Sequence, residues 1–123
     1  MQEGDAAIVT RKNALISEQK VSHMGGKGAV TVTPMLTPEQ FYGKGRSFSR
    51  VAIPPGSSIG AHRHRGDFEA YYILSGTGEF HDNGQVAAVF SGDLCYTPEG
   101  FSHGITNTGK ETLELISLIV FAP

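Results

Sequence analysis

Turn-forming residues interrupt the sequence at short intervals from residue 45 onward, and this spacing limits the chain to short secondary-structure elements. Glycine alone accounts for 16 of the 123 residues. The segments between the breaks are rich in β-branched and aromatic residues, and they cover 47–53, 61–64, 69–74, 78–81, 85–90, 94–97, 103–107 and 113–121. The pair Asn83-Gly84 predicts a two-residue hairpin, because both residues tolerate positive φ. Many short strands at regular spacing are typical of an all-β sandwich or barrel.

The first 45 residues have a more mixed pattern. Residues 13–21 fit either a strand or a short helix. Residues 30–33 alternate valine with threonine, as in a strand that ends at Pro34. The length of the chain fits one domain. We therefore expect residues 1–45 to pack on a barrel formed by residues 46–121, or on a partner subunit.

One short helix is predicted within this N-terminal part. Thr37 can cap it, Pro38 suits the first helical position and Gln40 completes a capping box. Leu36 and Phe41 stand where a hydrophobic staple would place them.

Composition and charge argue against several classes of protein. Ten Lys and Arg against 12 Asp and Glu give a net charge of −2, whereas nucleic-acid-binding proteins usually carry a basic face. No apolar run approaches the roughly 20 residues needed to cross a bilayer, and the first residues do not resemble a signal peptide. Cys95 is the only cysteine, so it cannot form an internal disulfide. We therefore expect a cytoplasmic protein with no nucleic-acid or membrane partner.

Three histidines and one glutamate form an array suited to a metal ion. His62 and His64 are two residues apart, so both imidazoles leave one face of a strand. Glu69 begins the next predicted strand, and His103 lies far downstream after another turn. Three neutral imidazoles and one carboxylate suit a divalent Mn, Fe, Ni, Cu or Zn ion, and an octahedral ion would keep two positions for water, substrate or dioxygen. Taken alone, the His-x-His pair is better explained as an accidental surface pair.

The chain resembles the cupin superfamily through two spaced motifs. The first is Gly, five residues, His-x-His, three or four residues, Glu, six residues and Gly, and it is met by Gly56, His62, His64, Glu69 and Gly76. The second is Gly, five residues, Pro-x-Gly, two residues, His, three residues and Asn, and it is met by Gly92, Pro98, Gly100, His103 and Asn107. The resemblance implies an all-β, single-domain antiparallel jelly-roll barrel with a metal inside. It also implies that the ligands of one divalent metal per chain are His62, His64, Glu69 and His103.

Among cupins, the chain looks most like compact single-domain bacterial proteins that are often grouped as oxalate-decarboxylase-like or mannose-6-phosphate-isomerase-like. This resemblance favours Mn2+, while the ligand set also accepts Fe2+, Ni2+ or Zn2+. The superfamily contains isomerases, dioxygenases, decarboxylases, lyases and non-enzymatic sugar binders, so the fold does not settle the function. Oxalate decarboxylases carry an arginine three residues before the first histidine ligand. Ile59 stands at that position here, which disfavours oxalate decarboxylation.

Two functional hypotheses follow for the metal site. The first, placed slightly ahead, is a metalloenzyme of the isomerase, dioxygenase or lyase type that acts on a small carboxylate or sugar derivative. The alternative is a module that binds a sugar or a carboxylate without turnover. A second titratable group aimed at the open metal positions would favour the enzyme, and the sequence does not identify one. A barrel with a vestigial metal site is a weaker third hypothesis, because all four ligands are intact.

Several other residues are candidates for lining the pocket. Arg46 and Arg50 share a strand parity and would either bind a carboxylate or phosphate or lie on a solvated edge, which we favour. Tyr71 shares the parity of Glu69 and would either reach the metal ligands or pack in the core. His23 lies in a glycine-rich loop that would either cover the barrel mouth as a lid or be disordered, and we favour disorder.

Four further residues are expected to be structural or exposed. Asn107 would hold its loop by side-chain hydrogen bonds to the backbone. Cys95 is expected to be a buried hydrophobe, and His81 to lie exposed beside the hairpin. Arg63 lies between the two histidines of the first motif and is expected to point away from the metal.

Apolar residues on both faces of two strands predict a homodimer. Ala70, Tyr72 and Leu74 point away from the metal side of their strand, and residues 113–121 are apolar on both faces. A monomer would expose an apolar patch of the kind that usually marks an interface. We expect residues 5–35 to contact the second copy, together with the outward face of residues 70–74.

Overall fold

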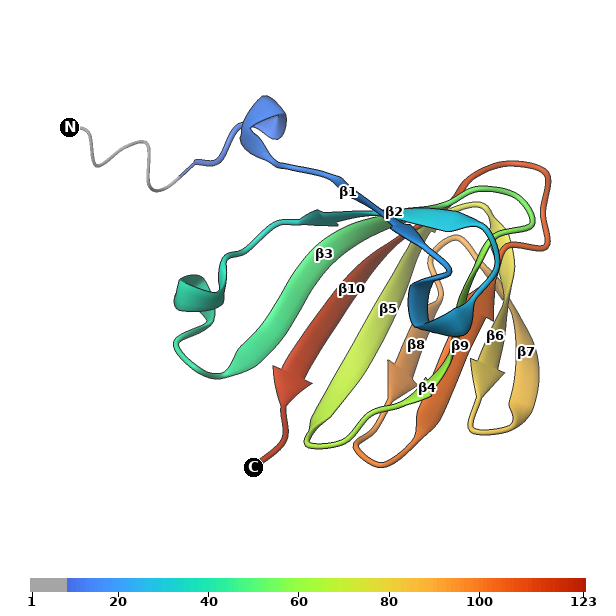
Figure 1. Ribbon diagram of the computed structural model, residues 1–123. Coiled ribbons are helices and arrows are strands. Elements are labelled where there is room, and N and C mark those ends of the chain that lie inside the picture. The colour runs from blue at the N-terminus through green and yellow to red at the C-terminus, as the bar shows by residue number, and fades with distance from the viewer. Residues whose placement is uncertain (1–8) are drawn as a thin grey trace.

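The computed structural model describes residues 9–123, whose ten strands form two facing antiparallel sheets (Figure 1). The six-stranded sheet has the order β1-β2-β3-β10-β5-β8, and the four-stranded sheet has the order β4-β9-β6-β7. The strands are β1 (Glu18–Val21), β2 (Ala29–Pro34), β3 (Gly45–Ile53), β4 (Ser58–Arg63), β5 (Asp67–Ser75), β6 (Thr77–Asp82), β7 (Gln85–Phe90), β8 (Leu94–Thr97), β9 (Ser102–Thr106) and β10 (Leu113–Phe121). The predicted all-β, jelly-roll class is confirmed.

The strands predicted from the turn spacing are all present. The predicted segments 85–90, 94–97 and 113–121 coincide with β7, β8 and β10, and the other five overlap β3, β4, β5, β6 and β9. The hairpin between β6 and β7 turns at Asn83 (φ 49°) and Gly84 (φ 93°), as predicted. β4 begins earlier than predicted because Ser58 and Ile59 already pair with β9.

Three short 3-10 helices lie in the first part of the described chain: η2 (Lys12–Ala14), η3 (His23–Gly25) and η4 (Pro38–Phe41). η4 is the helix predicted after Thr37, and the Thr37 amide donates to Gln40 Oε1 at 2.8 Å. Tyr42 (φ 51°) ends η4 after four residues, because a left-handed residue cannot continue a right-handed helix. None of the helices within residues 9–123 is long and apolar enough to cross a membrane.

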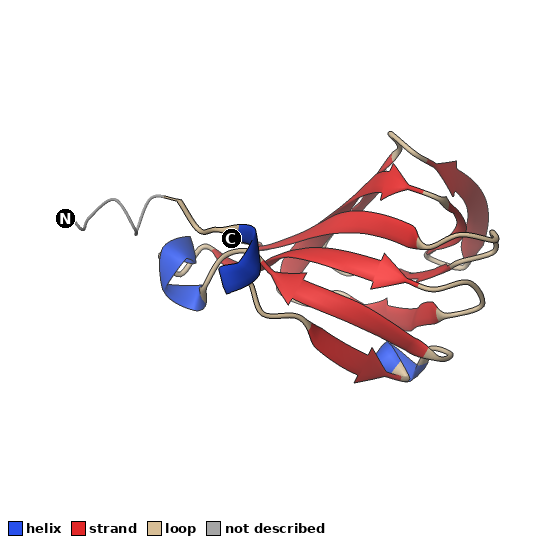
Figure 2. Ribbon diagram, turned by 90° about the horizontal axis from the view of Figure 1, so that it is seen from above, coloured by secondary structure: helices blue, strands red, loops and turns tan. Residues whose placement is uncertain are grey.

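The N-terminal segment extends the larger sheet and then continues beyond it. β2 pairs with β3, and β1 pairs with β2. Residues 13–21, which fit either a strand or a helix by sequence, contain the end of η2 and the whole of β1. η2 lies outside both sheets in Figures 1 and 2. Ile16, between η2 and β1, is 76% exposed.

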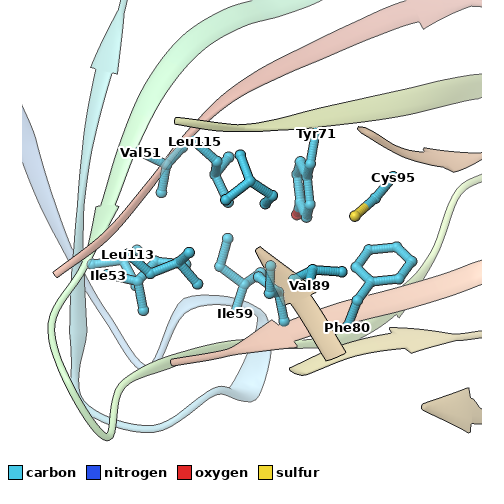
Figure 3. Close-up of a cluster of buried hydrophobic side chains, with 12 residues drawn as sticks. Val51, Ile53, Ile59, Tyr71, Phe80, Val89, Cys95, Leu113 and Leu115 are labelled. Atoms are coloured by element: carbon cyan, nitrogen blue, oxygen red, sulfur yellow. The ribbon is translucent and has the colours of Figure 1, made fainter. Parts of the chain in front are cut away.

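The hydrophobic core fills the space between the two sheets (Figure 3). Tyr71 of β5 and Cys95 of β8 lie across the core from Phe80 of β6 and Val89 of β7. The rings of Tyr71 and Phe80 also lie 4.9 and 5.8 Å from the ring of His103, measured between centroids. The apolar core therefore ends at a histidine.

Candidate metal centre

Four polar side chains converge where the apolar core ends. His62 lies in β4, His64 directly follows β4, Glu69 lies in β5 and His103 lies in β9. β4 pairs with β9 so that His62 is directly opposite His103. His64, Glu69 and His103 are buried, and His62 is partly exposed. The structure thus brings together the four residues singled out by spacing, and their potential ligand atoms all lie within 4.8 Å of one another.

The separations between these atoms fit an octahedral metal ion. Glu69 Oε1 lies 2.8 Å from His64 Nε2 and 3.0 Å from His103 Nε2. His103 Nε2 lies 3.0 Å from His64 Nε2 and 3.1 Å from His62 Nε2. An ion with bonds of about 2.1 Å separates neighbouring donor atoms by about 3.0 Å at right angles and by about 3.4 Å in a tetrahedron. The cluster could therefore hold a six-coordinate ion, whose two remaining positions would be open.

In each of the three imidazole rings, the nitrogen that points away from the cluster, Nδ1, lies within hydrogen-bond distance of an oxygen atom. His62 Nδ1 lies 2.7 Å from the carbonyl oxygen of Gly60. His64 Nδ1 lies 2.6 Å from Asp67 Oδ1, and His103 Nδ1 lies 2.8 Å from Thr97 Oγ1. A ring whose Nδ1–H donates has its lone pair on Nε2, which is how histidines that bind metals are usually oriented. The three Nε2 atoms that face one another are therefore suited to bind a cation.

Burial and hydrogen bonding have opposite effects on the Glu69 carboxyl. Burial alone would raise its pKa, but hydrogen bonds with His103, His64 and Ser117 outweigh burial and lower the pKa to about 2. The hydrogen bond with Glu69 raises the pKa of His64, whereas burial lowers the pKa of His62. In the metal-free protein, the hydrogen bond with Glu69 thus favours the charged form of His64.

The charges around the cluster also favour a cation. Asp67 and Glu69 are 2% and 5% exposed, so two carboxylates are buried within three residues of one another. Arg46 donates to Asp67 Oδ2 at 2.6 Å and balances one of them. Buried charges are costly unless they are paired. A divalent ion beside Glu69 would supply the missing positive charge.

Three residues that support the ligands were missed by the sequence analysis. Asp67 lies between the predicted strands 61–64 and 69–74, although its position two residues before Glu69 gives it the same strand parity. Ser117 donates to Glu69 Oε2, and its sequence signal was a polar residue in the middle of an apolar strand. Thr97 lies opposite Glu69 in the pairing of β5 with β8 and holds His103. Only knowledge of that strand pairing would have identified Thr97.

A cavity of about 350 Å3 lies over the cluster. Its lining includes His62, His64 and Glu69, with Tyr71 and Ile59 as apolar wall. Tyr71 is buried and stacks on His103 with 23° between the ring planes, so it both packs in the core and reaches a candidate ligand. Three arginines also line the cavity: Arg46, Arg63 and Arg65. The combination of a cation site with three guanidinium groups suits an anionic ligand.

The two candidate arginines of β3 have different positions. Arg50 pairs with Glu114 of β10 and does not line the cavity, as expected for a solvated edge. Arg46 is 58% exposed in its side chain, as expected for a solvated edge, but this edge also borders the cavity. Arg63 is exposed, as expected for an exterior residue; it too borders the cavity, and it donates to the carbonyl oxygen of Gly100.

Asn107 and Cys95 have the structural roles predicted for them, whereas His81, expected to be exposed, is only partly exposed. The Asn107 amide donates to the carbonyl oxygens of Ile53 and Glu111, at 2.7 and 2.8 Å. Cys95 is buried, and burial raises the pKa of its thiol to about 11, so it is an unreactive core residue. His81 lies at the end of β6 and is 39% exposed in its side chain.

The glycine-rich loop around His23 is ordered and covers part of the cavity, contrary to the expectation of disorder. His23 and Met24 line the cavity. Two glycines allow the η3 loop to lie against β4: a Cβ added at Gly60 would stand 2.1 Å from Met24 O, and one at Gly26 would stand 2.2 Å from Ser58 O. The backbone pairing of Ser58 N with Lys27 O, at 3.0 Å, holds the loop in place.

Comparisons of the sequence and of the structure with known proteins point to the same protein family. The cupin domain family (Cupin_2) matches residues 49–120. An oxalate-binding protein of Thermotoga maritima is 45% identical over 121 residues, which are 98% of this chain and 98% of that protein. An uncharacterised protein of Methanocaldococcus jannaschii is 28% identical over 109 residues, 89% of this chain and 87% of that protein. The crystal structure of a predicted oxalate decarboxylase from Thermotoga maritima superimposes with a TM-score of 0.90 at 43% identity, covering 94% of this chain and 100% of that one.

Proposed function

The chain belongs to the cupin family, and on that basis we propose that it holds one divalent metal ion and uses it to bind a small carboxylate such as oxalate. The observation that carries this proposal is the position of the histidine and glutamate cluster under a cavity lined by three arginines. The relative from Thermotoga maritima, which is named as oxalate-binding, supports the same ligand class. Binding without turnover thus takes the place of the enzyme as the first hypothesis.

We propose His62, His64, Glu69 and His103 as the metal ligands. A bound divalent ion would act as a Lewis acid that attracts a carboxylate oxygen. The protein residues orient the site: Gly60, Asp67 and Thr97 fix the three imidazoles, and Ser117 fixes the carboxylate of Glu69. The resemblance favours Mn2+, while Fe2+, Ni2+ and Zn2+ fit the same donors. The lone Cys95 is in keeping with a reducing cytoplasmic setting.

Oxalate is expected to displace water from the open positions of Mn2+ held in this site. The relaxation rate of water protons reports water bound to Mn2+, so it should fall when oxalate is added to the Mn2+-loaded protein. Isothermal titration calorimetry on the same sample gives the affinity. Mannose serves as the uncharged comparison. A closed shell of protein ligands, or a stronger response to mannose than to oxalate, would contradict the proposed function.

A metalloenzyme remains the second candidate, because of the position of His23. This imidazole lines the same cavity as His62 and Glu69, so it could serve as the additional titratable group that the enzyme hypothesis requires. Burial lowers its pKa below the usual value, so it is neutral near pH 7 and able to accept a proton. A screen of small carboxylates and sugar derivatives with the metal-loaded protein, followed over time for product, separates turnover from binding.

We also propose that the protein is a homodimer. Tyr72 pairs with Leu94 across β5 and β8, and Ala70 pairs with Tyr96. Tyr72, Leu94 and Tyr96 are 47%, 66% and 56% exposed, and neighbouring exposed apolar side chains of this kind often mark an interface. The N-terminal segment supplies Ile16 as a further exposed apolar side chain, while residues 5–8 of the expected interface lie outside the described residues.

Size-exclusion chromatography with light scattering is expected to give twice the chain mass of 13.1 kDa at micromolar concentration. Changing Leu94 and Tyr96 to serine should shift the mass toward that of one chain, since both lie on the outward face. Val86→Ser is the matched control, because Val86 is 57% exposed on the edge strand of the other sheet. A wild-type mass near that of one chain would refute the dimer.

A further inference from the structure

An irregularity in the pairing of β3 with β10 determines where Arg46 lies. Ile119 pairs with Ser47 and Val120 pairs with Gly45, so Arg46 has no partner in β10. Regular alternation would keep Arg46 on the same face as Arg50, which pairs with Glu114 away from the cavity. A β-bulge of this kind redirects a side chain. The bulge explains why Arg46 lines the cavity and Arg50 does not.

The guanidinium of Arg46 is fixed on one side and exposed on the other. Its Nη2 donates to Asp67 Oδ2 at 2.6 Å, and its central carbon lies 5.7 Å from the centroid of the Phe121 ring. Its side chain is nevertheless 58% exposed. Guanidinium carries five N–H donors, and Asp67 is its hydrogen-bond acceptor among residues 9–123. A group that is held in place with most of its donors unused is suited to bind a carboxylate with two parallel hydrogen bonds.

The position of Arg46 relative to the metal cluster suggests what it binds. Asp67 accepts from Arg46 with Oδ2 and contacts His64 Nδ1 with Oδ1. One carboxylate and one imidazole ring therefore separate the guanidinium from the candidate metal position. Both groups line the same cavity. A molecule with a single carboxylate can use one of these two anchors at a time, whereas a dicarboxylate long enough to span the separation can use both.

We propose that Arg46 is the second anchor of the ligand site, and that the preferred ligand is a small dicarboxylate with one end at the metal and the other at Arg46. The inference rests on the proposed function, because it assumes that the first carboxylate binds at the metal. It adds to that function a specificity-determining residue outside the metal ligands. The bulge in β3 serves both contacts of Arg46, because it turns the guanidinium toward the buried Asp67 and toward the cavity.

The test compares Arg46→Met with Arg50→Met in the Mn2+-loaded protein. Methionine keeps much of the length and apolar contact of the arginine but has no donors. Affinities for oxalate, malonate, succinate and acetate are measured by calorimetry, after elemental analysis has shown full metal occupancy. The preference of the wild type for its tightest dicarboxylate over acetate should fall by about tenfold or more in Arg46→Met. Arg50→Met should keep the wild-type preference.

Arg46→Lys keeps a cation beside Asp67, so it covers the case in which Arg46→Met loses metal or fails to fold. It should keep its metal and still show the reduced preference, because lysine lacks the planar fork. The proposal is overturned if the wild type binds acetate as tightly as every dicarboxylate. It is also overturned if a metal-loaded Arg46 variant weakens acetate and dicarboxylates by the same factor. Failure of the wild type to bind any of the four acids would instead refute the proposed function.

Discussion

Replacing His103 with alanine is expected to abolish stoichiometric metal binding. His103 Nε2 lies 3.0 to 3.1 Å from a potential ligand atom of each of the other three residues, Glu69, His64 and His62. Without it, three donors remain, and the cavity left between Tyr71 and Phe80 loosens their arrangement. Elemental analysis after gel filtration should give well below one tenth of a metal ion per chain, since loss of one ligand costs several kcal/mol of binding free energy.

His81→Ala is the matched control for this experiment. His81 is also in the four-stranded sheet, but it lies beside the hairpin, with its Nε2 3.9 Å from the Glu79 carboxylate. The control should therefore keep one metal per chain. His103→Gln provides a variant that fills the cavity, in case the alanine variant does not fold. Full metal occupancy in a folded His103 variant would show that the ligand assignment is wrong.

Metal binding is expected to shift the pH of greatest stability upward. In the metal-free protein, the pKa of Glu69 is about 2 against an ordinary 4.5, so its stabilising effect is complete above pH 4.5 and is lost as the pH falls toward 2. This corresponds to about 3 kcal/mol. The pKa of His64 is raised above its ordinary 6.5, so its stabilising effect is present below pH 6.5 and is lost as the pH rises. Glu69 and His64 therefore both favour the metal-free protein between pH 4.5 and 6.5, whereas the lowered pKa of His62 has the opposite effect below pH 6.5, because the folded protein favours its neutral form.

The metal-bound protein should show the opposite trend on the alkaline side. A metal ion needs neutral imidazoles, so it competes with the proton on His64 and binds more tightly as the pH rises. Calorimetric Tm values with and without EDTA, at pH 5, 6.5 and 8, measure the effect. The gain in Tm on adding Mn2+ should increase with pH, because tighter binding gives more stabilisation. If the gain in Tm on adding Mn2+ were the same at all three pH values, or larger at pH 5 than at pH 8, the proposed competition between the metal and the proton would be wrong.

Much of the fold and of the ligand cluster could be predicted from the sequence, because both depend on regular spacing. Alternation and turn residues located the strands from β3 to β10. The two motifs predicted that His62 and Glu69 would meet His103, although that histidine lies far away in the sequence. In the structure, the pairing of β4 with β9 places His62 opposite His103, and the potential ligand atoms of the cluster lie within 4.8 Å of one another.

The features that the sequence did not predict depend on departures from regular strand geometry and on close contacts between loops. Uninterrupted alternation would keep Arg46 away from the cavity, and the bulge that brings it there is not visible in the sequence. Asp67 follows the turn residue Gly66, so the predicted strand 69–74 does not include it, although it begins β5. The η3 loop around His23 depends on close contacts between Gly26 and Gly60, which residue spacing does not reveal.

The contact between the η3 loop and β4 also sets the smallest fragment of this chain that could keep the metal centre intact. Gly60 packs against Met24 and Gly26 on one side, and its carbonyl oxygen fixes His62 Nδ1 on the other. A chain shortened to begin after residue 28 would expose this stretch of β4 to water and give His62 more freedom to rotate. Residues 46–121 alone would contain all four candidate ligands but not the loop that supports His62.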